Sequence, residues 1–390
     1  MQQVESLDIK QDSTINRLAL LFCLFPFVLR TIPTDLQPWA FILILLRSIM
    51  IPKERLSYSW AVLFVVSSLI ILYRLRFNYD LFDTARSIPV YFTPVFLVLL
   101  FRSNFISADV LSKFLKITLI IYFAYGFLQK YDLDPLSFND IRPAFDRGVR
   151  SLTPEPSMFG YVSTLLMLSL LILEKATALD WIVYTCNMLL SLSMSAILAG
   201  LPLIFIAIFY SSSKLKLTFV TAFLLWLIFS DEFSLLYTER VLQLTSLPIR
   251  DLIVLDGSIN ERLGHLNYIF SQPLHYILGG SNGWGIDFSN FIKQDATFIQ
   301  GSNSNNILSG LGNVIYDGGL LGIMYLYLLF HQGYRVNNKL YTRDIIIIVV
   351  WVLVALQSIS LAVPLLSLPI GCFILRCRYP LTNLTKVDCS

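Results

Sequence analysis

Long apolar runs recur along the chain, separated by short polar segments. A membrane-spanning helix needs about 20 mainly apolar residues, and about 17 is the usual minimum. Several runs are shorter and reach that length only with their polar flanks. The pattern predicts an all-α polytopic membrane protein with about twelve transmembrane helices. We place these helices at residues 17–31, 36–51, 58–73, 88–101, 111–130, 157–173, 181–193, 196–210, 217–229, 306–330, 345–361 and 364–375.

Two longer polar segments interrupt this pattern. The larger covers residues 231–305, between the ninth and tenth predicted helices, and mixes charges, glycines and aromatics. The smaller covers residues 130–156. We expect a single transmembrane domain, residues 1–390, with both segments as loops on one side of the membrane.

Composition supports a membrane protein. The chain has 390 residues, of which 56% are hydrophobic and 14% charged, and its mean hydropathy is +0.67. Soluble domains average about 25% charged residues. A net charge of +3 gives no reason to expect a nucleic-acid partner. The first apolar run has no small-residue cleavage site after it, so we expect a membrane helix there rather than a signal peptide.

The positions of lysine and arginine predict the orientation, because cytoplasmic loops carry an excess of both. With both termini in the cytoplasm, more basic residues lie inside than outside, and both long loops face outward. The outer loops nevertheless keep several arginines, among them Arg142, Arg147 and Arg150. Each could pair with a nearby carboxylate. As a cluster they could equally hold an anion, because guanidinium offers a planar fork to phosphate oxygens.

The segment Arg150-Ser-Leu-Thr-Pro-Glu155-Pro-Ser157 ends the smaller loop. Prolines on both sides of Glu155 restrict the backbone and hold a carboxylate at the start of a helix, with Ser157 as the expected cap. Glu155 could simply favour the positive end of that helix. The rigid bracket is more than that role needs, so a catalytic role is an equal alternative.

Other chemistry has weaker support in the sequence. Asp132-Leu133-Asp134 spells a metal-binding DxD pattern, but three residues carry little information and we expect no metal. His265 and His275 are candidate acid–base groups with ordinary packing as the alternative, and His331 is expected to be structural. The cysteines show neither disulfide nor metal-ligand spacing, and no phosphate-binding loop occurs, so we expect no cofactor.

Several of these segments resemble one family. The Arg150–Ser157 segment is similar to the start of a mid-chain helix in bacterial O-antigen and exopolysaccharide repeat-unit polymerases (Wzy-type), within the O-antigen ligase/polymerase superfamily. Further similarities are Leu192-Ser-Met-Ser-Ala196 at a hairpin, Arg262 with Pro273 and Gly279–Gly285 in the large loop, and Asn303–Asn306 with Gly318–Gly322 at membrane re-entry. Two positions depart from the family pattern. Asn305-Asn306 stands where relatives often have His-Asn, and Met194 stands where they have arginine.

The resemblance implies a metal-independent glycosyltransferase in the bacterial inner membrane. It would join undecaprenyl-pyrophosphate-linked oligosaccharides, with a chain-length regulator and a flippase among its protein partners. Arg150 and Arg262 would stabilise the leaving pyrophosphate, and Glu155 would activate the acceptor hydroxyl. Substrate-binding candidates are Arg142, Arg147, His265, Trp284, Asn305 and Asn306.

Three other functions stay open. One is an interaction or scaffold protein, although that function gives no reason for the outer-face arginines. An O-antigen ligase would transfer the same donor to lipid A core, although the missing histidine at re-entry weakens that reading. A polysaccharide transporter or flippase would also suit about twelve helices. Against it, the chain shows no internal repeat, and its long loop comes after the ninth helix and faces outward.

Overall fold

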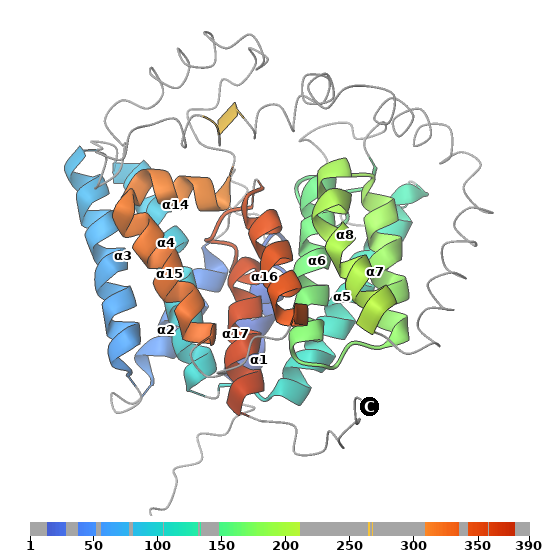
Figure 1. The fold of residues 1–390 in the computed structure, drawn as a ribbon, viewed down its shortest axis with the longest axis horizontal. Coiled ribbons are helices and arrows are strands. Elements are labelled where there is room, and N and C mark those ends of the chain that lie inside the picture. The colour runs from blue at the N-terminus through green and yellow to red at the C-terminus, as the bar shows by residue number, and fades with distance from the viewer. Residues whose placement is uncertain are drawn as a thin grey trace, which may run out of the picture.

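The structure is a computed structural model that describes residues 14–28, 38–51, 56–77, 81–103, 105–131, 133, 148–210, 264–265, 267, 309–334, 342–357 and 359–378. These residues form twelve helices and no strands, which confirms the predicted all-α class. Most helices stand side by side and alternate in direction, whereas one short helix, α14, lies across one end (Figure 1).

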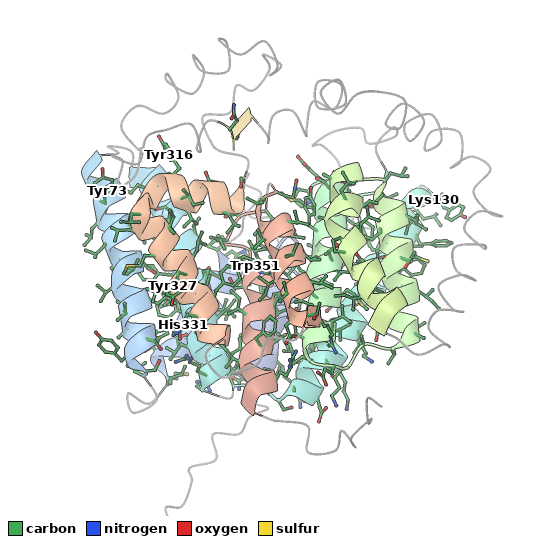
Figure 2. The ribbon with its side chains drawn as sticks, in the orientation of Figure 1. Tyr73, Lys130, Tyr316, Tyr327, His331 and Trp351 are labelled. Carbon is green, nitrogen blue, oxygen red and sulfur yellow. The ribbon has the colours of Figure 1, made fainter. Side chains whose placement is uncertain are left out.

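The helices are α1 (Thr14–Leu24), α2 (Trp39–Ile49), α3 (Tyr58–Phe77), α4 (Leu81–Arg102), α5 (Ala108–Lys130), α6 (Pro156–Ile172), α7 (Ala178–Ser191), α8 (Met194–Tyr210), α14 (Gly310–Gly318), α15 (Leu320–Tyr334), α16 (Thr342–Ala355) and α17 (Pro364–Arg378). We call the end of the array where α5 ends and α6 begins the site end. The opposite end, where α6 ends and α7 begins, is the basic end. Lys130 and Tyr316 lie toward the site end and His331 toward the basic end (Figure 2).

Most predicted helix boundaries fall within a few residues of the observed ones. The first helix ends earlier than predicted, at Leu24, because Pro26 cannot continue the hydrogen-bond ladder. The helix predicted over 345–361 ends at Ala355, and turns follow. The fourth helix begins earlier than predicted, at Leu81. Its first turns contain polar residues, so they are not part of the apolar run that predicted this helix. The helix predicted at 217–229 lies outside the described residues.

The prediction of one helix over 306–330 is wrong, because a corner divides it. α14 ends at Gly318, Gly319 has a φ of 53°, and α15 begins at Leu320. A side chain at Gly322 would collide with the backbone carbonyl of Val314, so this glycine lets α15 fold closely against α14. The glycines at 318, 319 and 322 therefore mark a sharp turn.

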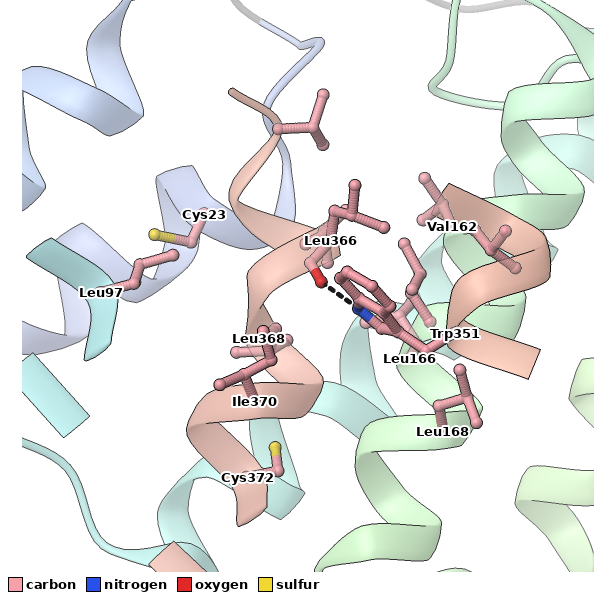
Figure 3. Close-up of a cluster of buried hydrophobic side chains, with 14 of the residues drawn as sticks. Cys23, Leu97, Val162, Leu166, Leu168, Trp351, Leu366, Leu368, Ile370 and Cys372 are labelled. Carbon is pink, nitrogen blue, oxygen red and sulfur yellow. Dashed lines mark hydrogen bonds between the residues drawn. The ribbon is translucent and has the colours of Figure 1, made fainter. Parts of the chain in front are cut away.

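α17 lies at the centre of the packed core, against α4, α6 and α15 (Figure 3). Large apolar side chains fill the space between these helices, among them Leu366 and Leu368 of α17 and Trp351 of α16. At Gly371 the ring of Phe101 approaches so closely that no side chain would fit. Burial of apolar side chains on all sides makes α17 the axis about which the other helices are arranged.

Tryptophan and tyrosine side chains donate hydrogen bonds to backbone carbonyls near the prolines of two helices. α4 contains Pro89 and Pro94, and α17 contains Pro369, each of which lacks the N–H that a helix requires. On α4, Trp60 Nε1 donates to the carbonyl of Val95 at 3.0 Å, and the Tyr325 hydroxyl donates to that of Tyr91 at 3.0 Å. On α17, Trp351 Nε1 donates to the carbonyl of Leu366 at 2.6 Å (Figure 3). These bonds join α3 and α15 to α4, and α16 to α17, close to the interrupted turns.

Two helical segments, Tyr58–Leu75 and Ala108–Lys130, are long and apolar enough to cross a membrane by length and composition. Several shorter apolar helices stand beside them. The described residues are therefore compatible with a membrane protein, while a twelve-span arrangement stays a prediction.

Ion pairs join the helices at the basic end. Arg376 donates to both carboxylate oxygens of Asp344, at 2.8 and 3.0 Å. The other pairs are Lys175–Asp109 at 3.1 Å, Lys116–Asp180 at 3.2 Å and Arg343–Glu174 at 3.8 Å. These contacts connect the starts of α5, α7 and α16 with the ends of α6 and α17. His331, on α15, stacks against Tyr327 at a ring distance of 5.7 Å.

Candidate functional site

Glu155 is the residue immediately before α6. Its backbone is extended, with φ −138° and ψ 152°, and Pro156 occupies the first turn, where a missing N–H costs nothing. The expected cap is corrected here: Glu155 holds the cap position, and Ser157 lies inside the helix. The Glu155 carboxylate makes no capping hydrogen bond to the helix and instead accepts one from the Ser157 hydroxyl, at 3.4 Å.

The backbone before Glu155 is fixed at Ser151. This fully buried residue has a φ of 52°, in the left-handed region that side chains other than glycine seldom occupy. Its hydroxyl donates to the carbonyl of Tyr122 at 2.6 Å. The side chain of Gln129 binds both backbone polar groups of Ser151. α5 therefore positions the segment that leads into α6.

Thr153 closes a turn between Arg150 and Glu155. Its backbone N–H donates to the Arg150 carbonyl at 3.1 Å. Its hydroxyl lies 2.6 Å from the same carbonyl oxygen and 2.8 Å from that of Glu155. The prolines and this hydroxyl hold Arg150 and Glu155 on the two sides of one turn. Both residues are half-buried, so the turn presents a guanidinium and a carboxylate at the site end.

The segment also rests on the end of α7. The backbone N–H of Val149 donates to the carbonyl of Leu190 at 2.9 Å. Gly148 has a φ of 86°, and a side chain there would collide with the backbone of Ser191. Only glycine suits this position, because it tolerates both the conformation and the close approach. α5 and α7 thus fix the Arg150–Glu155 turn from two directions.

A cluster of neutral polar side chains lies within the first turns of α6. The hydroxyl of Tyr161 lies 2.6 Å from Ser195 Oγ and 3.1 Å from Gln357 Oε1, so its single proton can be donated to only one of them. Ser193 Oγ lies 3.2 Å from Ser195 Oγ. α6, the start of α8 and the turn after α16 therefore meet through these groups. We call Tyr161, Ser193, Ser195 and Gln357 the polar cluster.

α14 connects the polar cluster to the far side of the array. At its first residue, the N–H of Gly310 donates to the carbonyl of Gln357 at 3.0 Å, and Ser309 caps the helix through the N–H of Gly312 at 3.0 Å. At its other end, the Tyr91 hydroxyl donates to the Asp317 carboxylate at 2.9 Å, and Arg74 donates to the same oxygen. Both ends of α14 are therefore fixed.

Of the predicted catalytic residues, the structure describes Arg150 and Glu155, which lie on one short segment joined by the Thr153 hydrogen bonds. His265 is buried, and burial lowers the pKa of its imidazole to about 4, so it is uncharged at neutral pH. The other predicted site residues, namely Arg142, Arg147, Arg262, Trp284, Asn305 and Asn306, lie outside the described residues, as do His275 and the Asp132–Asp134 pattern.

Sequence reasoning missed Gln129, Tyr161 and Gln357. One signal was available for Tyr161, because it lies four residues after Ser157 and so shares its face of the helix. Gln357 offers no such signal, since its contact with Tyr161 joins residues 196 positions apart.

Among the described residues, no three His, Cys, Asp or Glu side chains gather as metal ligands would. The sequence matches no protein-family model and no curated protein.

Proposed function

We propose that this chain is a glycan polymerase of the bacterial inner membrane, which joins undecaprenyl-pyrophosphate-linked repeat units into a surface polysaccharide. The observation that supports it most is the Arg150–Glu155 turn. This turn holds a cation for a leaving phosphate and a carboxylate for an attacking hydroxyl in a fixed backbone. α5 and α7 keep this turn in place.

A membrane setting is supported by the outer surfaces of the helices. Ile117, Ile120 and Ile121 of α5 are large apolar side chains that remain exposed. Such surfaces are unfavourable in water and suit a lipid environment. Several serines inside helices donate to a backbone carbonyl of the preceding turn, as Ser67 and Ser169 do. Internal hydrogen bonds of this kind are needed where no water is available.

Charge distribution supports the orientation. Basic side chains of the described residues lie mainly at the basic end, namely Arg17, Arg47, Arg102, Lys113, Lys116, Lys175, Arg343 and Arg376. Fewer basic residues lie at the site end, namely Arg74, Arg76, Arg86, Lys130 and Arg150. By the positive-inside rule the basic end faces the cytoplasm. The Arg150–Glu155 turn then faces the periplasm, where lipid-linked repeat units are polymerised in this proposal.

The proposed reaction is a single displacement at the anomeric carbon of the donor. The acceptor hydroxyl oxygen forms the new bond to that carbon, and the bond from carbon to pyrophosphate oxygen breaks with its electron pair. Glu155 accepts the hydroxyl proton and later releases it to water. Arg150, together with Arg262 from the large loop, stabilises the negative charge that grows on the pyrophosphate. Arg142 and Arg147 would assist from the smaller loop.

A deletion strain tests this function. Surface polysaccharide separated on a gel should show lipid A core capped with single repeat units, since units are still made and attached. Uncapped core with accumulated lipid-linked polymer would instead identify a ligase. Core without any unit, together with lipid-linked single units retained on the cytoplasmic face, would identify a flippase. Either of these two results would overturn the polymerase.

A further inference from the structure

Arg47 is a buried arginine in the last turn of α2, at the basic end. Only 7% of it is exposed, and its Nε donates to Asn16 Oδ1 at 2.6 Å. Asn16, in the first turn of α1, is fully buried and donates through Nδ2 to the carbonyl of Phe105 at 2.6 Å. Asn16 therefore links Arg47 to the connection between α4 and α5 and fixes the plane of the guanidinium.

The charge of Arg47 has no carboxylate partner within the ranges that the structure describes. Asn16 offers it only a neutral acceptor. Other cations of the basic end each form an ion pair, namely Lys116, Lys175, Arg343 and Arg376. A buried cation without a counter-ion is unfavourable, because it has lost water and gained no opposite charge. An anionic ligand at Arg47 would remove that cost.

The two terminal nitrogens of Arg47 can be reached by such an anion. Neither has a hydrogen-bond partner in the described part of the chain. Nor is either one among the enclosed polar atoms that lack a partner there, in contrast to Nε of Arg343. Both nitrogens therefore meet the surface, and together they form a planar edge suited to two oxygens of one phosphate.

Exposed apolar side chains accompany this arginine. Leu46, Ile49 and Met50 are large exposed residues beside it on α2, and Leu18 is another on α1, which packs against α2. Such a surface is unfavourable in water and suits acyl chains. A free phosphate ion would use the guanidinium alone, whereas a phospholipid would use the apolar surface as well.

We propose that Arg47 binds the phosphate of an anionic phospholipid in the cytoplasmic leaflet, and that Asn16 is a positioning residue for it. The proposal rests on the membrane setting and orientation proposed above, and not on the polymerase reaction. In that orientation the basic end faces the leaflet whose anionic headgroups attract cations. Because the Arg150–Glu155 turn lies at the opposite end, the lipid is a structural partner rather than a substrate.

General attraction between a basic end and an anionic membrane is the competing explanation. Arg17 supplies a matched control, because it follows Asn16 on α1, carries the same charge and is exposed. Loss of either arginine removes one charge from the basic end, but only Arg47 has its guanidinium fixed by Asn16. Arg47→Lys separates charge from geometry, since lysine keeps the charge and loses the planar edge.

The test uses the purified full-length chain in detergent micelles that contain phosphatidylglycerol or phosphatidylcholine with identical acyl chains. Native mass spectrometry measures the lipid that is retained. The wild type should prefer phosphatidylglycerol, and Arg47→Gln should weaken its apparent affinity about tenfold or more, as expected for lost hydrogen bonds to a charged group. Arg47→Lys should lose most of the affinity, and Arg17→Gln should keep it. Equal retention of both lipids by the wild type, or equal losses in Arg47→Gln and Arg17→Gln, would overturn the site.

Two further measurements use only the wild type and do not depend on how a variant folds. Inorganic phosphate should not displace phosphatidylglycerol, and full displacement would overturn a lipid as the ligand. Phosphatidylglycerol with a photoreactive group at its headgroup should label residues 14–17 or 46–50. Labelling confined to other segments would overturn the site. Failure of the proposed function looks different, because a chain that retains lipid here and forms no polymer refutes the polymerase alone.

Discussion

Gln129 binds Ser151 through both of its backbone polar groups. Its Oε1 accepts from the Ser151 N–H at 2.7 Å, and its Nε2 donates to the Ser151 carbonyl at 3.1 Å. This double contact stabilises a residue whose left-handed backbone costs roughly 1–2 kcal/mol. Because Ser151 directly follows Arg150 within the Arg150–Glu155 turn, this glutamine on α5 helps to fix the backbone that carries both charged groups.

Gln129→Leu should remove polymer formation while the protein still reaches the membrane. The substitution leaves two backbone groups of Ser151 without their partner, at a cost of roughly 1–3 kcal/mol each. Gln129→Glu keeps an acceptor for the N–H and should retain partial activity. Asn187→Leu is the matched control, since Asn187 Nδ2 also binds a backbone carbonyl of α5, that of Leu119 at 3.3 Å. The control should lower the melting temperature without loss of turnover, and equal turnover in Gln129→Leu would exclude this role.

Arg150 should not be replaceable by lysine. Arg150→Lys keeps a positive charge but loses the planar fork that binds two phosphate oxygens, so turnover should fall at least tenfold. Arg150→Ala should abolish polymer. Arg102→Lys is the control at the basic end and should leave the rate unchanged. Polymer yield and chain length on a gel measure all three, and normal polymer from Arg150→Ala would remove Arg150 from the site. The same comparison applies to Arg262.

The Arg74–Asp317 pair should stabilise the position of α14. The two side chains are mostly enclosed, with 22% and 11% of their surface exposed. Removal of one partner from a buried pair costs about 3–5 kcal/mol, whereas removal of both is often nearly neutral. Asp317→Leu alone should therefore lower the melting temperature in detergent, and addition of Arg74→Met should restore most of it. Additive destabilisation in the double variant would show that the pair does not act as a unit.

The sequence predicted the helices well because each depends on its own apolar residues. Ends were predicted less well, since a run such as 88–101 stops at the first charges while the helix α4 continues back to Leu81. The corner at Gly319 was missed because α14 and α15 together read as one apolar segment. Only the glycines at 318, 319 and 322 indicate a sharp turn there. The sequence does not show why glycine is needed at 322, because the reason is the close approach of the Val314 carbonyl in the folded chain.

The candidate site was predictable where it is local. Arg150 and Glu155 lie on one short segment, and the two prolines beside Glu155 indicate that its backbone is restricted. The contacts that fix the segment come from α5 and α7, and the partner of Tyr161 comes from the turn after α16. Such contacts follow from the packing of helices distant in sequence, which no local pattern encodes.

Thiol labelling tests the orientation directly. In a background without native cysteines, Tyr131→Cys at the site end should react with a membrane-impermeant reagent added outside intact cells. Tyr131 is 58% exposed, so access should not limit labelling. Lys175→Cys at the basic end should react only after the membrane is opened. The reverse result would place the proposed donor site in the cytoplasm and contradict the polymerase.

Glu155→Gln separates catalysis from helix stabilisation. The amide keeps the shape of the side chain and the proline bracket, and it still accepts a hydrogen bond from Ser157. It cannot take a proton. General-base catalysis typically contributes about 10²- to 10⁴-fold, so polymer should fall to traces while donor binding persists.

A carboxylate that only complements the positive end of α6 predicts a different result. Its loss would cost about 1 kcal/mol at most, and chain lengths would stay normal. Glu174→Gln is the control, because Glu174 pairs with Arg343 at 3.8 Å at the basic end and has no place in the reaction. Polymer formation and donor binding should be measured on the same purified variants. If Glu155→Gln turns over as fast as this control, Glu155 is not the base, and the acceptor hydroxyl must lose its proton elsewhere.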